Sequence, residues 1–143
     1  MKIAVHIVAT LFGLLFLAGG LFFFFGTMPP GPPEESLPGK FMAALGPTGY
    51  LAFIKVCEII GGALVVVPKT RNLGLLILGP IVINILCFHG FVAKGGFGPA
   101  HAFITVAALF LLWAERKAFA GLVKRGNPMV AGGAADPVEG KAP

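Results

Sequence analysis

Long apolar runs, separated by short polar or Pro- and Gly-rich breaks, dominate the pattern of this sequence. The first run extends from Ile3 to Phe25 and is interrupted only by single polar residues such as His6 and Thr10. About 20 apolar residues span a bilayer as a helix, whereas the core of a signal peptide has only about 7–15. The run therefore predicts an uncleaved first transmembrane helix.

Three further apolar runs follow, and each is bounded by residues that stop helices. The segment Met28–Pro33 is proline-rich, Pro68 closes the second run, and glycines precede the fourth, so helices end at these points. The pattern predicts an all-α, integral membrane four-helix bundle with helices at about 3–25, 47–67, 73–92 and 100–117. Residues 1–120 form the predicted four-span domain, and the Gly-, Ala- and Pro-rich residues 121–143 are expected to be a disordered cytoplasmic tail.

Composition supports a membrane protein and sets its expected orientation. Hydrophobic residues make up 57% of the 143 residues and charged residues 12%, about half of the charged share of ordinary soluble domains. The net charge of +5 comes from residues at the ends of apolar runs and not from a basic, aromatic-rich cluster, so no nucleic-acid partner is expected. The predicted inner side carries more basic residues than the outer side, which has Lys40 and Lys94, so the positive-inside rule predicts two cytoplasmic termini. The inner-side residues are Lys2, Lys69, Arg71, Arg116, Lys117, Lys124 and Arg125.

Two charged residues, Lys55 and Glu58, lie near the middle of the second predicted span. A charge at the centre of a bilayer costs about 2.5–3.5 kcal/mol on insertion scales. The spacing of three residues allows the two side chains to meet on one helical face. Two interpretations stay open: a buried ion pair that fixes helix register, or a site for a ligand or a proton.

Depth along the predicted helices brings other polar residues to the same region. A rise of about 1.5 Å per residue places Glu58 and Asn84 near the midplane, and Lys55 and His89 in the outer half. His101 opens the fourth predicted helix on the outer side. These five residues are the candidate ligand-binding residues of a polar pocket that opens outward. Asn84 and His89 are about 140° apart on an ideal helix, so they cannot share one narrow face.

The sequence contains no recognisable metal site. Glu58 and His89 are too few for a closed site, which needs three or four ligands. Cys57 and Cys87 form no C-x-x-C motif and are expected to be small buried apolar residues. No catalytic residue is assigned, and no haem, iron–sulfur or flavin motif is evident.

Two blocks of this sequence resemble the DoxX-like family of small membrane proteins. Thr48-Gly49-Tyr50-Leu51, followed by Lys55-x-x-Glu58-x-x-Gly61-Gly62, is similar to the family's second helix, and Leu75–His89 is similar to its third. The arginine and glycine signature of the family's first helix is absent, which suggests a subfamily. The resemblance implies a four-helix bundle in a bacterial inner membrane, with links to quinone-dependent sulfur oxidation, thiol-redox complexes or membrane-protein assembly.

The leading functional hypothesis is a redox-associated subunit that binds a quinone or a similar small lipid-soluble ligand. Lys55 would donate a hydrogen bond to the ligand, Asn84 would orient it, and Glu58 and His89 would carry protons. Partners expected on this hypothesis are the lipid bilayer, a redox partner subunit and further copies of the chain. The alternative is a non-enzymatic scaffold or assembly factor with a structural Lys–Glu pair. A small-molecule or ion pathway is less favoured, because four short helices enclose little space.

Overall fold

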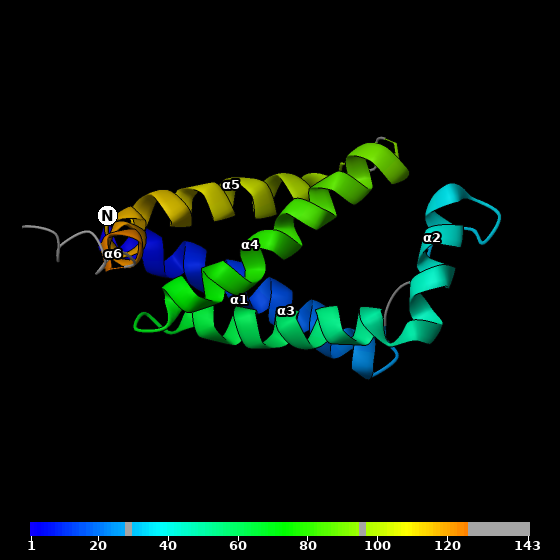
Figure 1. The fold of residues 1–143 in the computed structure, drawn as a ribbon, viewed down its shortest axis with the longest axis horizontal. Coiled ribbons are helices and arrows are strands. Elements are labelled where there is room, and N and C mark those ends of the chain that lie inside the picture. The colour runs from blue at the N-terminus through cyan, green and yellow to red at the C-terminus, as the bar shows by residue number, and fades with distance from the viewer. Residues whose placement is uncertain (28–29, 95–96, 126–143) are drawn as a thin grey trace, which may run out of the picture.

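The computed structural model describes residues 1–27, 30–94 and 97–125, and the regular structure in these ranges is helical. Six α-helices are joined by short turns and by two irregular helical segments (Figure 1). η1 (Gly46–Thr48) is a 3₁₀ turn, and η2 (Phe88–Val92) is a π-helical turn. The α-helices are α1 (Lys2–Phe24), α2 (Leu37–Leu45), α3 (Tyr50–Val66), α4 (Arg71–Cys87), α5 (Pro99–Ala114) and α6 (Arg116–Arg125).

Helices α1 and α3 form the most extensive helix contact of the bundle, and glycines allow their close approach. A Cβ atom added at Gly13 would lie 2.6 Å from the carbonyl oxygen of Gly62, and one added at Gly62 would lie 2.6 Å from that of Gly13. Small residues at such contacts let two backbones approach closely. Gly13 and Gly62 therefore let the backbones of α1 and α3 approach each other.

Helix α4 packs on the opposite side of α3, and α5 completes the bundle against α1 and α4 (Figure 1). The neighbouring Gly61 faces α4, where Leu78 fills the space that a side chain would occupy. The core joins four of the helices around fully buried Phe12, Val65, Leu78 and Leu111. Its remaining members are Ala9, Phe16, Leu75, Val82, Ile104 and Ala107.

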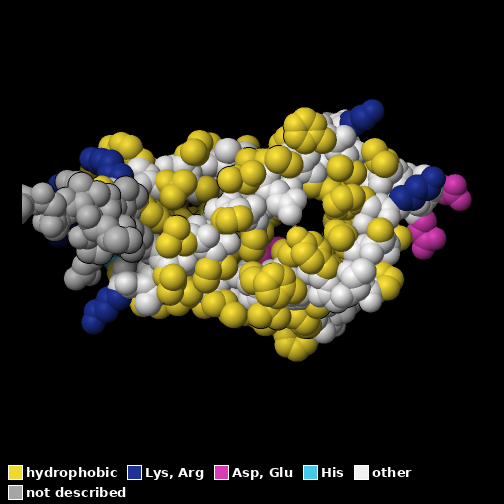
Figure 2. Space-filling model, in the orientation of Figure 1, with side chains coloured by type: hydrophobic (Ala, Val, Ile, Leu, Met, Phe, Trp, Pro, Cys, Tyr) yellow, Lys and Arg dark blue, Asp and Glu magenta, His cyan; other side chains and the backbone are white. Residues whose placement is uncertain are grey.

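The face of the bundle seen in Figure 2 is mostly apolar, and its basic side chains lie toward the two ends. Large exposed side chains such as Ile7, Leu11 and Leu109 cover the helices. Within the described ranges, α1 and Arg71–Val92 are long and apolar enough to cross a membrane, and the bent pair Leu37–Thr48 and Tyr50–Val66 would make a third span. The 16 residues of α5 rise only roughly 24 Å, less than the ~30 Å hydrocarbon core. A bundle of four spans therefore stays a prediction.

Several predicted helix boundaries differ from those observed. The helix predicted for 47–67 begins only at Tyr50, because Gly49 has a left-handed backbone (φ 72°) that ends η1. The fourth predicted helix, 100–117, is divided at Glu115 into α5 and α6. The third predicted helix, 73–92, begins earlier, at Arg71. The α-helix continues through Pro80 and ends at Cys87, where a π-helical turn follows.

Two segments expected to be irregular contain helix. Residues 37–45, which lie outside the four predicted helices, form α2, because the Ser36 hydroxyl accepts a hydrogen bond from the Gly39 amide at 3.1 Å and caps the helix. Helix α6 extends to Arg125 and so includes the first residues of the predicted tail. The rest of that tail, 126–143, lies outside the described residues.

Candidate functional site

A cavity of about 590 Å³ lies between the α2–η1 segment and the adjoining faces of α3 and α4. Figure 2 shows its opening as a hollow surrounded mainly by hydrophobic side chains, with an acidic side chain visible at its edge. The lining includes the charged residues Lys55 and Glu58, which lie close to each other. The rest of the lining is mostly apolar. The volume is in the usual range of small-molecule sites.

The cavity exists because the chain bends sharply between η1 and α3. The two helical segments meet at 86°, so α2 extends away from the bundle and does not continue the axis of α3 (Figure 1). The left-handed conformation of Gly49 at this bend favours glycine, because it carries no Cβ. Phe41 of α2 then reaches back to Phe88, with ring centroids 5.5 Å apart. The bend and this aromatic contact enclose the space.

Lys55 and Glu58 form an ion pair in the wall of this cavity. The Lys55 ammonium donates to both carboxylate oxygens of Glu58, at 3.0 Å to Oε1 and 2.8 Å to Oε2. Glu58 is 5% exposed, and the Lys55 side chain is 15% exposed. The predicted contact between the two residues is confirmed, and the charge of each is compensated by the other.

The same pair also borders the contact between α1 and α3. A Cβ atom added at Gly19 of α1 would lie 3.8 Å from Oε2 of Glu58. The carboxylate thus faces the position of Gly19 on α1 and also lines the cavity. This position is compatible with both interpretations of the pair, as a structural contact and as a ligand site.

Asn84 and His89 both line the cavity, although their spacing predicted different faces of the helix. The π turn η2, which begins at Phe88, explains part of this result because it changes the angular spacing of the residues that follow. The Asn84 side chain is exposed and lies in the cavity wall. Its amide is therefore available to a molecule in the cavity.

His101 lies outside the cavity lining but contacts it through His89. The two imidazole rings have centroids 3.8 Å apart and an interplanar angle of 48°. Nδ1 of His89 donates to the carbonyl oxygen of Ile85 at 2.8 Å, and Nδ1 of His101 accepts from the Gly98 amide at 3.2 Å. Four of the five predicted site residues thus line one cavity: Lys55, Glu58, Asn84 and His89. The fifth, His101, contacts the ring of His89.

Aromatic side chains make up much of the cavity wall, and sequence reasoning did not assign them to the site. Phe41, Tyr50, Phe53 and Phe88 come from three different segments and surround the polar group. They lie near the predicted outer ends of apolar runs. Aromatic residues are common there because they are enriched at the membrane–water interface, whether or not a ligand site is present. Only the bend at Gly49 brings them together.

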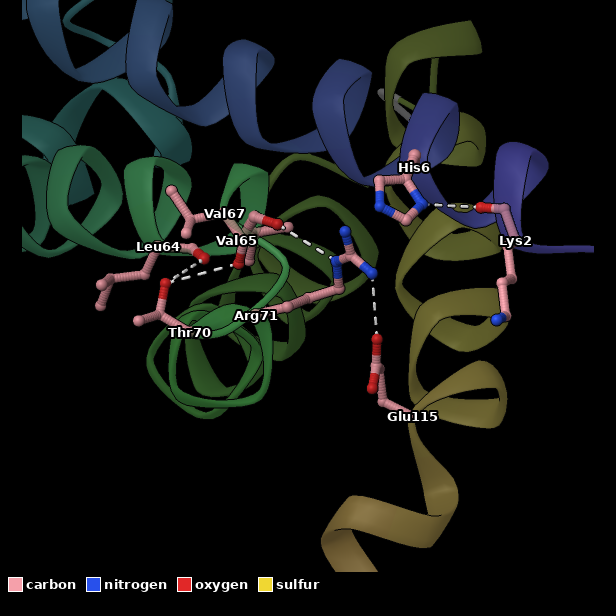
Figure 3. A network of polar contacts seen from close by, with 8 residues as sticks. All are labelled: Lys2, His6, Leu64, Val65, Val67, Thr70, Arg71 and Glu115. Atoms are coloured by element: carbon pink, nitrogen blue, oxygen red, sulfur yellow. Dashed lines mark hydrogen bonds and ion pairs between the residues drawn. The ribbon is translucent and has the colours of Figure 1, made fainter.

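A second buried ion pair lies at the opposite end of the bundle and was also not predicted. Arg71 is 3% exposed, and its Nη1 donates to Oε1 of Glu115 at 3.1 Å (Figure 3). Its Nε donates to the carbonyl oxygen of Val65 at 3.3 Å. The sequence suggested that Arg71 was a topology signal in a surface turn, whereas its side chain joins α3, α4 and the end of α5.

The cysteines differ from the prediction that both are buried. Cys57 is half-buried and lines the cavity, and Cys87 is exposed; both are free thiols. Among the described residues there is no group of three or more His, Cys, Asp or Glu residues that could hold a metal ion.

Comparison with known proteins gives limited information on identity. Uncharacterized protein YwoB of Bacillus subtilis (strain 168) is 32% identical to this chain over 76 residues. The match covers 53% of this chain and 49% of that protein, so the chain spans about half the length of the curated relative it matches. No family model matches the chain. No solved structure matches it significantly.

Proposed function

We propose that this chain is a multi-pass membrane protein whose cavity binds a small, lipid-soluble ligand such as a quinone. The observation that carries the proposal is the combination in one cavity of aromatic walls with a buried, charge-compensated Lys55–Glu58 pair. Ligand sites are typically apolar clefts with a few polar groups that fix orientation. A quinone has an apolar ring and tail together with polar oxygens, and so matches an apolar cleft that carries a few polar groups.

Each polar group has a proposed role in that complex. The Lys55 ammonium donates a hydrogen bond to a ring oxygen of the ligand, and the Asn84 amide orients the ring. His89, at the rim, and Glu58 exchange protons with it. With the termini in the cytoplasm of a bacterial cell, the cavity opens in the outer half of the inner membrane. Any electron transfer would need the bound quinone itself or a redox partner subunit.

Binding by the purified protein in lipid nanodiscs tests this function. We expect a quinone with a fully substituted ring to bind the native protein, and Lys55→Met and Glu58→Gln to weaken binding by about tenfold each, the usual effect of losing a hydrogen bond to a charged group. Lys69→Met is the matched control, because Lys69 lies on the exposed turn before α4. Equal affinity of all four proteins would overturn the proposal.

The alternative function is a scaffold or assembly factor, and the position of Glu58 against Gly19 of α1 favours it. On that alternative the pair only holds α1 and α3 in register. Buried pairs of this kind can often be replaced by apolar residues without loss of stability. A Lys55→Met/Glu58→Leu variant that keeps both its fold and its quinone affinity would support the scaffold and contradict the ligand site.

A further inference from the structure

The charge of the cavity restricts the class of ligand beyond lipid solubility. Lys55 and Glu58 compensate each other at 2.8 Å, so the polar end of the cavity has no net charge to offer. A ligand with a charged head would have to leave water for a mostly apolar space without a free counter-ion. Burying an uncompensated charge is costly, so both anionic and cationic heads are disfavoured.

Hydrogen-bond capacity restricts the class further. An ammonium has three N–H donors, and the two contacts of Lys55 with Glu58 leave at least one for a ligand. A carboxylate has about four acceptor positions, and Lys55 occupies two of those on Glu58. Unused donor and acceptor capacity therefore lie side by side in the cavity wall.

Resting on the proposed function, we infer that the cavity selects an uncharged amphiphile whose head carries a hydroxyl group. A hydroxyl both accepts from Lys55 and donates to Glu58, whereas a carbonyl or an ether oxygen can only accept. Asn84, whose exposed side chain lies in the cavity wall, serves either group. Among quinone-type molecules the preferred form is thus the hydroquinone, and hydroxylated lipids belong to the same class.

The aromatic wall indicates where the apolar part of such a ligand lies. Phe53 is 65% exposed and Tyr50 49% exposed, and both line the cavity. The wall is therefore open to the surroundings on this side, which in a bilayer are lipid chains. The hydroxyl head lies against the ion pair, and the tail leaves the cavity past these two rings.

Naphthalene derivatives test the inference because they share one ring system and differ only in the head. 1-Naphthol is a donor and an acceptor, 1-methoxynaphthalene accepts only, 1-naphthoate is an anion, and 1-naphthylmethylammonium is a cation. Binding to the protein in nanodiscs is measured by fluorescence, with empty nanodiscs as the partition background. We expect naphthol to bind about tenfold more tightly than methoxynaphthalene, and both ions to bind more weakly than either.

The variant Glu58→Gln isolates the contribution of the carboxylate. It removes the strong acceptor, so the preference for naphthol should fall to about threefold or less, the range of a neutral hydrogen bond. Lys69→Met should keep the native preference. Equal binding of naphthol and methoxynaphthalene, or tightest binding of an ion, would overturn the inference and leave the proposed function standing if a substituted quinone still binds. Absence of binding by every compound would overturn both.

Discussion

This bundle holds two cation–carboxylate pairs that are largely removed from the surroundings, and the pairs are built differently. Lys55 and Glu58 are three residues apart on α3 and line a cavity. Arg71 and Glu115 are 44 residues apart, and the arginine is enclosed by three helices (Figure 3). A pair within one helix adds little to the connection between helices, whereas a pair between distant segments holds them together. The comparison supports our proposal that the first pair serves binding and the second serves stability.

The largest expected effect is that of removing the arginine. Arg71→Ala breaks the contact with Glu115 and the bond to the Val65 carbonyl, and removal of one partner of a buried pair costs about 3–5 kcal/mol. We expect the lower end of this range, because Glu115 is 23% exposed and can be solvated. Denaturant unfolding in detergent, followed by circular dichroism, measures the loss.

The matched control for this arginine is Lys117→Ala at the same end of the bundle. Lys117 is exposed, so its replacement should change stability by less than about 0.5 kcal/mol. Similar unfolding curves for the two variants would show that the Arg71–Glu115 pair does not stabilise the bundle.

The next effect concerns the contact between α1 and α3, which positions Glu58. Gly62→Ala places a methyl group 2.6 Å from the Gly13 carbonyl oxygen, and overpacking of this kind costs about 1–3 kcal/mol. Gly79→Ala is the control, since nothing lies within 4 Å of the added carbon, and alanine there favours the helix. Thermal unfolding should rank Gly62→Ala below native and Gly79→Ala at or above it; the reverse order would refute the close contact.

A smaller effect on stability is expected for the Lys55–Glu58 pair on α3, and it distinguishes a structural role of the pair from a ligand-binding role. Lys55→Met/Glu58→Leu removes both charges together, so no unpaired charge stays buried, and stability should change by less than about 1.5 kcal/mol. Quinone affinity should fall at least about tenfold, or 1.4 kcal/mol. Unfolding and binding are measured on the same preparation, and a large loss of stability would place this pair in the same structural class as Arg71–Glu115.

The smallest expected effect comes from the cavity wall. Phe53→Ala removes one aromatic side chain that is already 65% exposed, so we expect affinity to fall only about threefold, from partial loss of apolar contact. Phe24→Ala, on the exposed end of α1, is the control. Titration of both variants with the same quinone distinguishes them, and an unchanged affinity for Phe53→Ala would remove this ring from the binding surface.

The sequence predicted the helical class and much of the polar site for clear physical reasons. Long apolar runs require internally satisfied backbone groups, so they specify helices. The i,i+3 spacing of Lys55 and Glu58 lies within one helix, and local geometry alone brings the two together. Depth along straight helices likewise placed Asn84 and His89 near the same cavity.

Other features depend on tertiary arrangement and had no local signal. The cavity arises from the bend at Gly49, and a Gly-Pro-Thr-Gly segment before an apolar run is equally compatible with a helix that starts at the proline. The pairing of Arg71 with Glu115 joins residues far apart in the chain, so no periodicity reveals it. The π turn at Phe88–Val92 changes the facing of His89 in a way that ideal helical spacing cannot show.

The thiol in the cavity offers the most direct test of the central claim that this space holds a ligand. Cys57 lines the cavity, and Cys87 is exposed outside it, so the two cysteines form an internal comparison. Labelling by a membrane-permeant maleimide is followed by mass spectrometry with and without a quinone whose fully substituted ring cannot add a thiol. The account predicts slower labelling of Cys57 and unchanged labelling of Cys87. Equal rates at Cys57 with and without a saturating quinone would contradict it.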